Sequence, residues 1–385
     1  MRTITTTEQL AEFCAHCAKF DYVTIDTEFL RERTYYSKLC LIQMAHPGEG
    51  DEGAVLIDVL EPDLSLDPLY ALFQDESVVK VFHAARQDLE IFYVDRGIFP
   101  KPFFDTQVAA MVCGFGEQVG YETLVRKIAK AQLDKSSRFT DWSARPLSDK
   151  QKHYALGDVT HLREIYEFLK RKLHQTKRTS WVEEEVEILT NPDTYNANPE
   201  DAWKRLKTRS NSRRFLATVQ ELAKFREAYA QERNIPRNRV FKDDALMEVA
   251  ATRPKAIGDL GKSRLLLREA RKGAIGEGIL AAVKAADAIP NEKLPQVAKS
   301  RQRPQGSEGL ADLLRVLLKA KAEESGVAQK LIANASDLDD IAAGLGADQV
   351  FRGWRNEVFG KDAKDLCDGK VALSADGSSV KIVHI

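Results

Sequence analysis

The first hundred residues alternate short apolar runs with polar connections. Three β-rich runs, at residues 22–29, 39–46 and 54–59, follow a helical pattern and are separated by short connections. Connections this short favour antiparallel neighbours in a sheet. A fourth run, at residues 78–85, comes after a helical stretch and leads directly into another helix that begins near Arg86. The pattern therefore predicts strands joined both by turns and by helices.

Helical periodicity dominates the following seventy residues. Residues 106–113, 122–129 and 148–173 have the helical period, so the N-terminal part is predicted to be an α/β fold, a mixed sheet with helices packed around it. Ser148 and Gln151 have the spacing of a capping box, in which each side chain bonds the other residue's backbone N–H. They fix the predicted start of the third helix.

The apolar period is lost at residues 190–200, where two prolines and three asparagines indicate a linker. Beyond it the pattern predicts only short helices and turns. Similar stretches recur there at an offset of 91 or 92 residues, as when ELAK at 221–224 aligns with DLLR at 312–315. Two copies of one small helical module explain this repeat better than one large domain.

These patterns divide the chain into four parts. Three glycines of the first helical module, Gly273, Gly276 and Gly278, are predicted to lie in an interhelical loop. The predicted parts are an α/β domain at 1–175, a linker at 176–205, and two all-α modules at 206–290 and about 306–385.

The composition, 43% hydrophobic and 30% charged, is that of a globular protein, and no run approaches the roughly 18 apolar residues of a membrane span. The N-terminus lacks the apolar segment of a secretory signal, so we expect a cytoplasmic protein. Five sparse cysteines indicate reduced thiols. Cys14 and Cys17, spaced C-x-x-C, share the helical period of apolar neighbours and are predicted to be core residues.

The near-zero net charge conceals an asymmetry along the chain. The formal charge is −10 over residues 1–200, +10 over 201–300 and −1 over 301–385. An acidic part can hold divalent cations while a basic part attracts a polyanion backbone. The charge alone is also compatible with a merely solvated basic face.

Asp26 and Glu28 lie within the apolar strand pattern YVTIDTEF. Because side chains alternate along a strand, the two carboxylates share one face. Their mutual repulsion is costly in an apolar setting unless a cation compensates for it. The pair therefore indicates a metal site, with an exposed strand end as the alternative.

Two further acids and a tyrosine have both structural and functional interpretations. Asp88, at the start of the helix after the fourth strand, is also suited to the positive end of a helix dipole. Asp158 lies inside the capped helix, with Tyr154 four residues before it on the same face. An exposed acid beside a half-buried tyrosine would explain the second pair equally well.

In order, these acids and the tyrosine resemble the DEDD superfamily of 3′→5′ exonucleases, and the surrounding text resembles bacterial ribonuclease D. Asp26 and Glu28 match the first motif, Asp88 the second, and Tyr154 with Asp158 the third. The segments that carry the narrower resemblance are VTIDTEFLRERTYYSKLCLIQ, VFHAARQDLEIF, FFDTQVAA and DWSARPLSDKQKHYALGDVTHL.

The resemblance implies a ribonuclease H-like mixed sheet followed by two HRDC-like helical domains, the second more divergent. It also implies two divalent ions, Mg²⁺ or Mn²⁺, whose chemistry suits carboxylate oxygens. Asp26 would bridge the two ions. Glu28 and Asp158 would complete the site of the ion that activates water, and Asp88 would support the second ion. Tyr154 would orient the attacking water.

The expected activity is hydrolysis of RNA from its 3′ end, with release of nucleoside 5′-monophosphates. The expected partner is structured RNA with a single-stranded 3′ tail, and the resemblance implies tRNA precursors. The protein is expected to be a monomer and to have no membrane partner. A DNA 3′→5′ exonuclease of the same chemistry and a non-catalytic RNA-binding module remain as alternatives.

Another branch of the superfamily uses a histidine five residues before the last acid, and His153 occupies that place. At about 100° per residue, Tyr154 lies some 40° from Asp158 around the helix axis and His153 about 140° away. Because Ser148 already starts the helix, His153 is expected to face elsewhere. The geometry favours Tyr154.

Four other residues have open interpretations. Asp105 is predicted to be a helix cap rather than a partner of the metal ligands. His83 would contact substrate or fill a strand end, and Trp142 with Arg145 would bind a nucleotide or form a structural turn, which we favour.

Overall fold

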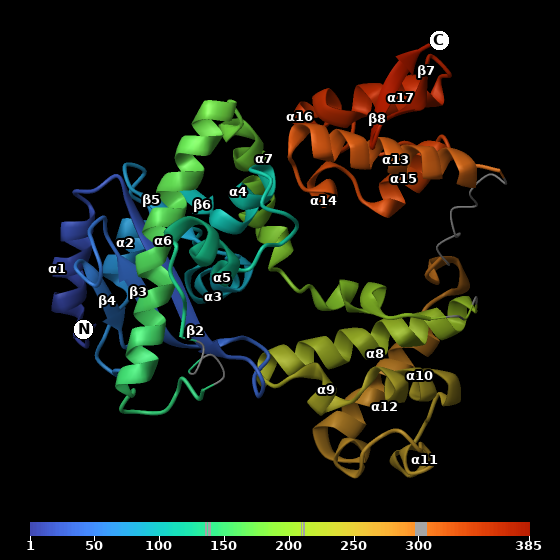
Figure 1. Ribbon diagram of the computed structural model, residues 1–385. Coiled ribbons are helices and arrows are strands. Elements are labelled where there is room, and N and C mark those ends of the chain that lie inside the picture. The colour runs from blue at the N-terminus through green and yellow to red at the C-terminus, as the bar shows by residue number, and fades with distance from the viewer. Residues whose placement is uncertain (135–136, 138–139, 209, 211, 297–305) are drawn as a thin grey trace.

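The computed structural model describes the whole chain except residues 135–136, 138–139, 209, 211 and 297–305 (Figure 1). The N-terminal domain contains the predicted mixed sheet, which has six strands in the order β1-β4-β3-β2-β5-β6. Strand β3 is antiparallel to both its neighbours, and the other pairs are parallel. The strands are β1 (Arg2–Ile4), β2 (Tyr22–Leu30), β3 (Lys38–Ala45), β4 (Ala54–Ile57), β5 (Val79–Phe82) and β6 (Phe103–Asp105).

Helices cover both faces of this sheet. One face packs its apolar residues against α1 (Thr7–Cys17), α2 (Asp67–Phe73) and α3 (Arg86–Arg96). Cys14 and Cys17 lie in that core as free thiols, as predicted. The other face is crossed by the long helix α6 (Asp149–Thr176), which Figure 1 shows running the length of the domain.

The start of α6 is where the sequence predicts it. Ser148 is the N-cap, and its side chain and that of Gln151 form the capping box. The helix is tied to the centre of the sheet by the buried Thr24, whose hydroxyl donates to the backbone carbonyl of Val159 over 2.8 Å. This bond fixes the height of α6 above β2.

The predicted linker at 176–205 is wrong for its first half. Helix α7 (Thr179–Leu189) occupies it and packs Val182 and Val186 against α4 (Thr106–Val112) and α6. The run of acidic residues 183–185 obscures this apolar face in the sequence. Later in the segment, Ala202 on the 3₁₀ turn η3 (Pro199–Arg205) belongs to the core of the first helical module.

The region between β6 and α6 also differs in detail from its prediction. The predicted helix at 122–129 is divided into α5 (Tyr121–Leu124) and the π-helical turn η1 (Val125–Ala129). Together with α4 and α7 these elements form a second apolar core at the C-terminal end of α6.

The first helical module is built around its longest helix, α8, as the all-α prediction requires. The predicted interhelical loop at its glycines is wrong, because Gly273, Gly276 and Gly278 all belong to α12. A Cβ at Gly278 would overlap the ring of Phe225, so this glycine lets α12 approach α8 closely. The module comprises α8 (Arg213–Glu232), α9 (Arg237–Val240), α10 (Asp243–Thr252), α11 (Ile257–Leu260), η4 (Arg268–Arg271) and α12 (Gly273–Ala288).

The second module repeats the helix order of the first, and α14 and α15 begin 92 residues after α9 and α10. Its helices are α13 (Glu308–Ser325), α14 (Gln329–Ile332), α15 (Ala335–Ala342), α16 (Gly353–Arg355), η6 (Asn356–Gly360) and α17 (Lys361–Cys367). The all-helical prediction does not include the hairpin of β7 (Val371–Asp376) and β8 (Ser379–His384) that ends it. Gly377, with φ +62°, forms the turn between these strands.

The second module docks on α4 and α7 of the N-terminal domain. Trp181 and Trp354 stack with ring centroids 4.7 Å apart, and Arg355 forms an ion pair with the buried Glu185. The amide of Ala328 donates to the carbonyl of Met111 over 3.0 Å.

Among the described residues, no helix is long and apolar enough to cross a membrane.

Candidate active site

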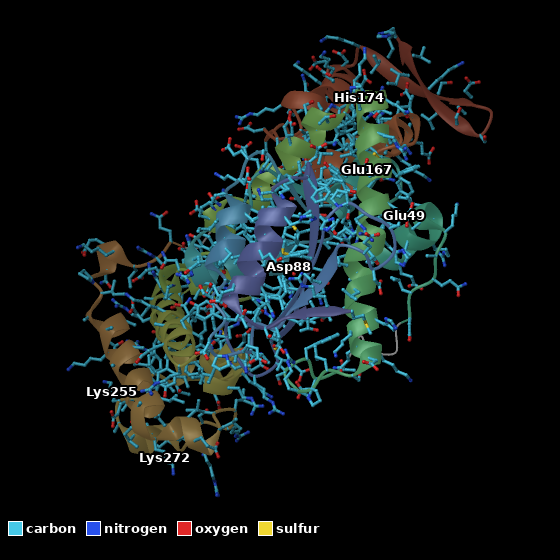
Figure 2. The ribbon with its side chains drawn as sticks, turned by 90° about the vertical axis from the view of Figure 1, so that its left-hand side faces the viewer. Glu49, Asp88, Glu167, His174, Lys255 and Lys272 are labelled. Atoms are coloured by element: carbon cyan, nitrogen blue, oxygen red, sulfur yellow. The ribbon has the colours of Figure 1, made fainter. Side chains whose placement is uncertain are left out.

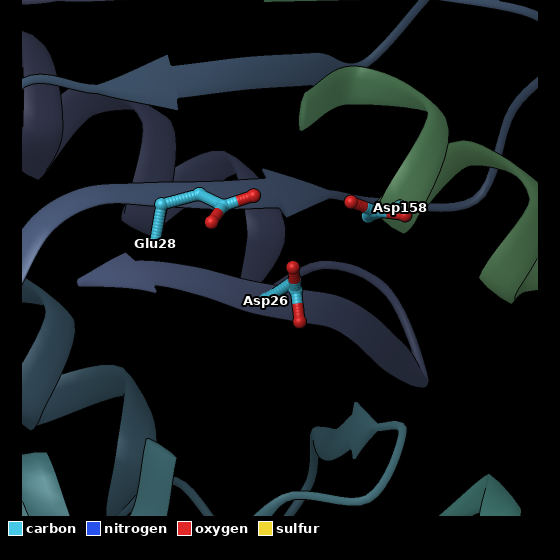
Figure 3. A group of neighbouring side chains, drawn as sticks. All are labelled: Asp26, Glu28 and Asp158. Atoms are coloured by element: carbon cyan, nitrogen blue, oxygen red, sulfur yellow. The ribbon is translucent and has the colours of Figure 1, made fainter. Parts of the chain in front are cut away.

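Three of the predicted acids converge between β2 and α6. One carboxylate oxygen each from Asp26, Glu28 and Asp158 can be chosen so that all three lie within 4.8 Å of one another. Figure 3 shows the side chains pointing toward a common centre, two from the strand and one from the helix. The strand period and the helix period together produce this arrangement, because each places its acids toward the other element.

Burial and mutual repulsion make the carboxylates of Asp26 and Glu28 hard to ionise. Burial, and then repulsion from Asp158, Asp88 and Glu28, raises the pKa of Asp26 well above its usual range. The same first cause, with repulsion from Asp158 and Asp88, raises the pKa of Glu28 to about 9. Together with Asp158 they place three carboxylates at one point, which fits a divalent cation that would stabilise their charged forms.

Asp88 lies beside this cluster rather than within it. It is buried in the first turn of α3, in the interior of the domain (Figure 2), and its carboxylate accepts a hydrogen bond from the hydroxyl of Thr27. Burial raises the pKa of Asp88 to about 7, although the bond from Thr27 acts in the opposite direction. Asp88 contributes to the raised pKa values of Asp26 and Glu28, so the four acids form one electrostatic group.

Thr27 is a site residue that sequence reasoning missed. It lies between the two strand acids and faces the opposite side of β2, where it reaches Asp88. The available signal was a polar β-branched residue at an otherwise apolar position of the strand.

The turn before α3 is held by Asp105, which caps α4 as predicted. Its carboxylate accepts from Gln107 and Val108 in α4 and also from the amides of Ala84 and Ala85. Asp105 therefore fixes the backbone that carries Asp88. Nearby His83 follows the end of β5, lies 3.0 Å from the Thr106 hydroxyl and contacts the ring of Tyr121.

Tyr154 and His153 point to different environments. His153 is exposed, whereas Tyr154 is half-buried one turn before Asp158, with its ring 6.0 Å from that of Trp142. This is the orientation that the helix period predicts. Tyr154 is thus on the side of α6 that carries Asp158.

Trp142 and Arg145 form the structural turn that the sequence favours. Trp142 is buried, and Arg145 donates two hydrogen bonds of 2.6 Å to Asp58. Arg145 also donates to the carbonyl of Cys40 over 2.8 Å. With these bonds formed, the guanidinium holds the chain before α6 against the sheet.

Comparison with known proteins assigns the chain that carries this site to a family. Residues 1–174 match the family model described as 3′-5′ exonuclease, and residues 215–283 match that of the HRDC domain. Ribonuclease D of Jannaschia sp. (strain CCS1) is 65% identical over 383 residues, covering 100% of this chain and 99% of that protein. The chain belongs to the ribonuclease D family. Ribonuclease D of Granulibacter bethesdensis is 46% identical over 384 residues, covering 99% and 96%.

A solved structure extends the similarity to the whole fold. The crystal structure of Escherichia coli RNase D has a TM-score of 0.82 and 30% identity, covering 96% of this chain and 98% of that one. Membership of the ribonuclease D family makes the protein a 3′→5′ exoribonuclease with an RNA substrate. The family also implies dependence on a divalent metal, and the cluster of Asp26, Glu28 and Asp158 is consistent with it.

Proposed function

We propose that the protein trims single-stranded 3′ tails of structured RNA, tRNA precursors among them, by two-ion hydrolysis that releases nucleoside 5′-monophosphates. The convergence of Asp26, Glu28 and Asp158 carries this proposal. A non-catalytic RNA-binding role is disfavoured because it gives no reason to keep repelling, partly buried carboxylates together.

The donor set fits hard divalent cations. Its ligands are carboxylate oxygens, which Mg²⁺ and Mn²⁺ prefer, and it contains no thiolate or imidazole. In the proposal Asp26 is shared by two ions, Glu28 and Asp158 complete one site, and Asp88 supports the other. When bound, such ions activate a water molecule near neutral pH and stabilise charge on the attacking and leaving oxygens.

The protein's own groups orient the reactants. Tyr154 projects from the turn of α6 before Asp158, so its hydroxyl is proposed to orient the attacking water. Thr27 holds Asp88 through a hydrogen bond, and Asp105 holds the turn that leads into α3. These bonds keep the acid of the second motif in place before substrate arrives.

The choice of substrate is supported by two observations. The E. coli enzyme of similar fold is described as an exoribonuclease involved in structured RNA processing. In this chain, residues 201–300 carry a charge of +10, which suits a polyanion. We propose that the protein acts as a monomer.

The test compares matched RNA and DNA duplexes that carry the same single-stranded 3′ tail, each with Mg²⁺ and with Mn²⁺. The proposal predicts nucleoside 5′-monophosphates from the RNA tail, arrest near the duplex, and at least about tenfold slower release from DNA. Equal rates on the two tails would favour the DNA exonuclease alternative. A tRNA precursor with a short 3′ extension should be shortened to its mature end.

A further inference from the structure

The loop that follows the catalytic strand is docked on the first helical module. The side-chain oxygen of Asn234, at the end of α8, accepts from the amides of Tyr35 and Tyr36 over 3.1 and 3.0 Å. The Tyr35 hydroxyl donates to Glu227, which is only 1% exposed and also pairs with Arg205. These bonds join the module firmly to the loop between β2 and β3.

A cavity of about 1070 Å³ lies behind this contact. Its walls come from the β2–β3 loop, the start of α3, residues 193–205 and the turn before α9, so both domains line it. Arg86 and Gln87 belong to its wall and immediately precede Asp88. The cavity therefore reaches the first turn of the helix that carries Asp88, although none of the four acids lines it.

The charge of this cavity is positive. Five cationic side chains line it against three anionic ones. Arg86 is exposed and, among the residues that the structure describes, makes no ion pair. Lys204 is 61% exposed and forms an ion pair of 2.6 Å with the exposed Asp201, which a phosphate can replace. Lys255 and Lys272, by contrast, lie at the outer end of the first module, away from Asp88 (Figure 2).

Aromatic side chains accompany these cations. The rings of Tyr36 and Tyr195 line the cavity. A positive groove with interleaved aromatic rings binds single-stranded nucleic acid, because the cations contact phosphates and the rings stack on bases.

We propose that this interdomain cavity binds the two or three RNA nucleotides immediately 5′ of the nucleotide being removed, with Arg86 and Lys204 contacting their phosphates. The proposal rests on the proposed function, since it assumes that RNA enters the acid cluster by its 3′ end. It assigns the first module a specific role at the active site, beyond general attraction of a polyanion.

The test is a double variant, Arg86→Gln with Lys204→Gln, which removes two cations and spares the bonds to Glu227. Its matched control is Lys19→Gln with Lys284→Gln, which removes one exposed cation from each domain outside the cavity. Binding of a single-stranded RNA decanucleotide is measured by fluorescence anisotropy at several salt concentrations. An Asp26→Asn background prevents degradation.

The cavity variant should bind about tenfold more weakly than the control at 0.1 M salt. Its slope of log affinity against log salt should be shallower by about 1.4, since each lost phosphate contact accounts for about 0.7. In the active enzyme, its KM should change more than kcat, and kcat/KM should fall about tenfold more for the decanucleotide than for a dinucleotide.

Affinity and slope equal to those of the control would overturn the cavity proposal. That failure is distinct from failure of the proposed function, because binding in the Asp26→Asn background needs no hydrolysis. The proposed function would fail instead if the unmodified enzyme released no mononucleotides from RNA.

A second observation concerns Gln43 on β3. Its side chain is 0% exposed, yet neither its amide nitrogen nor its amide oxygen has a hydrogen-bond partner among the described residues. Leaving a buried polar group unpaired is costly, so the unpaired amide of Gln43 needs an explanation.

The strand register supplies an explanation for the unpaired amide. Gln43 pairs directly with Asp26 across β2 and β3, and it pairs with the apolar Leu56 on its other side. Directly opposed residues of antiparallel strands share a face and have Cβ atoms about 4.5–5.5 Å apart. The unpaired amide is therefore a neighbour of the central acid, under α6.

We infer that Gln43 is a positioning residue whose amide N–H group holds the Asp26 carboxylate in the orientation that binds metal. An apolar residue of the same length would remove this support without changing the packing volume much.

The test measures metal binding without RNA. Thermal unfolding of Gln43→Met is followed against Mg²⁺ concentration, with Met44→Leu, a buried neighbour on the other face of β3, as the control. Gln43→Met should be at least as stable as the parent without metal, and its midpoint for stabilisation by Mg²⁺ should rise about tenfold. Gln43→Asn, which keeps an amide, should recover part of that affinity.

A merely structural glutamine would lower the metal-free melting temperature and leave the Mg²⁺ midpoint within about twofold of the parent. That result would overturn the inference. The readout is independent of catalysis, so it does not depend on the identity of the RNA.

Discussion

The two faces of strand β2 differ in chemistry. Val23 and Ile25 point into the apolar core under α1, α2 and α3. Thr24, Asp26 and Glu28 point toward α6, where one hydroxyl fixes the helix and two carboxylates meet Asp158. One strand thus contributes stability on one side and a costly charge cluster on the other.

The difference shows how the domain holds repelling acids in place. The apolar face fixes the strand by burial, which is worth roughly 25 cal/mol per Å² of apolar surface. The acidic face is expected to lower the stability of the metal-free protein, since its groups have raised pKa values. Variants on the two faces should therefore have opposite effects on stability and activity.

Asp26→Asn should have the largest effect on catalysis. It keeps the shape of the side chain and removes the charge shared by both proposed ions, so hydrolysis of RNA should fall about 10³-fold or more. The melting temperature should stay the same or rise. Activity within about tenfold of the parent in a single-turnover assay would refute the metal assignment.

Tyr154→Phe should reduce the rate about 10²-fold, because it removes the hydroxyl that orients the water and almost no volume. The matched variant His153→Ala should change the rate by less than about threefold, since His153 is exposed on another side of α6. Both are measured with the same metal and at the same pH. An inactive histidine variant beside a nearly normal phenylalanine variant would reverse the assignment.

Ile25→Ala tests the apolar face. Removing a buried side chain that is 0% exposed should lower the free energy of unfolding by about 2–5 kcal/mol. The folded enzyme should keep its kcat within about threefold at a temperature well below the transition. Denaturant unfolding and a rate assay at that temperature measure the two quantities, and a loss of rate without a loss of stability would contradict the division between faces.

The smallest effect is expected on the stability of the metal-free protein, for Glu28→Gln. The pKa of Glu28 is about 9 in the folded state against an ordinary 4.5, so the folded state binds more protons between these values. Parent stability should therefore decrease as pH rises through that range. The variant should melt at least about 2 °C above the parent at pH 8, with a smaller difference at pH 5, and the opposite trend would show that Glu28 is not electrostatically strained.

Much of the site is predictable from local periods. The two-residue period of β2 places Asp26 and Glu28 together, and the helix period with the Ser148 cap places Tyr154 beside Asp158. Asp88 is found through its motif, but its bond to Thr27 crosses from α3 to β2 and has no local signal.

The errors have physical causes. The three glycines of α12 suggest a loop because glycine disfavours helices, yet at Gly278 a Cβ would overlap the ring of Phe225 on α8. The Gly377-Ser378 pair between two runs of alternating residues is a hairpin signal, which the helical repeat obscured. Docking of Tyr35 on Glu227 joins positions 192 residues apart, which no local pattern reports.

Binding of Mg²⁺ to the RNA-free protein, measured by titration calorimetry, tests the central claim most directly. The account predicts saturable binding by the parent, with protons released because the ligand acids have raised pKa values, and loss of that binding in Asp26→Asn. Equal binding by the parent and Asp26→Asn would contradict it.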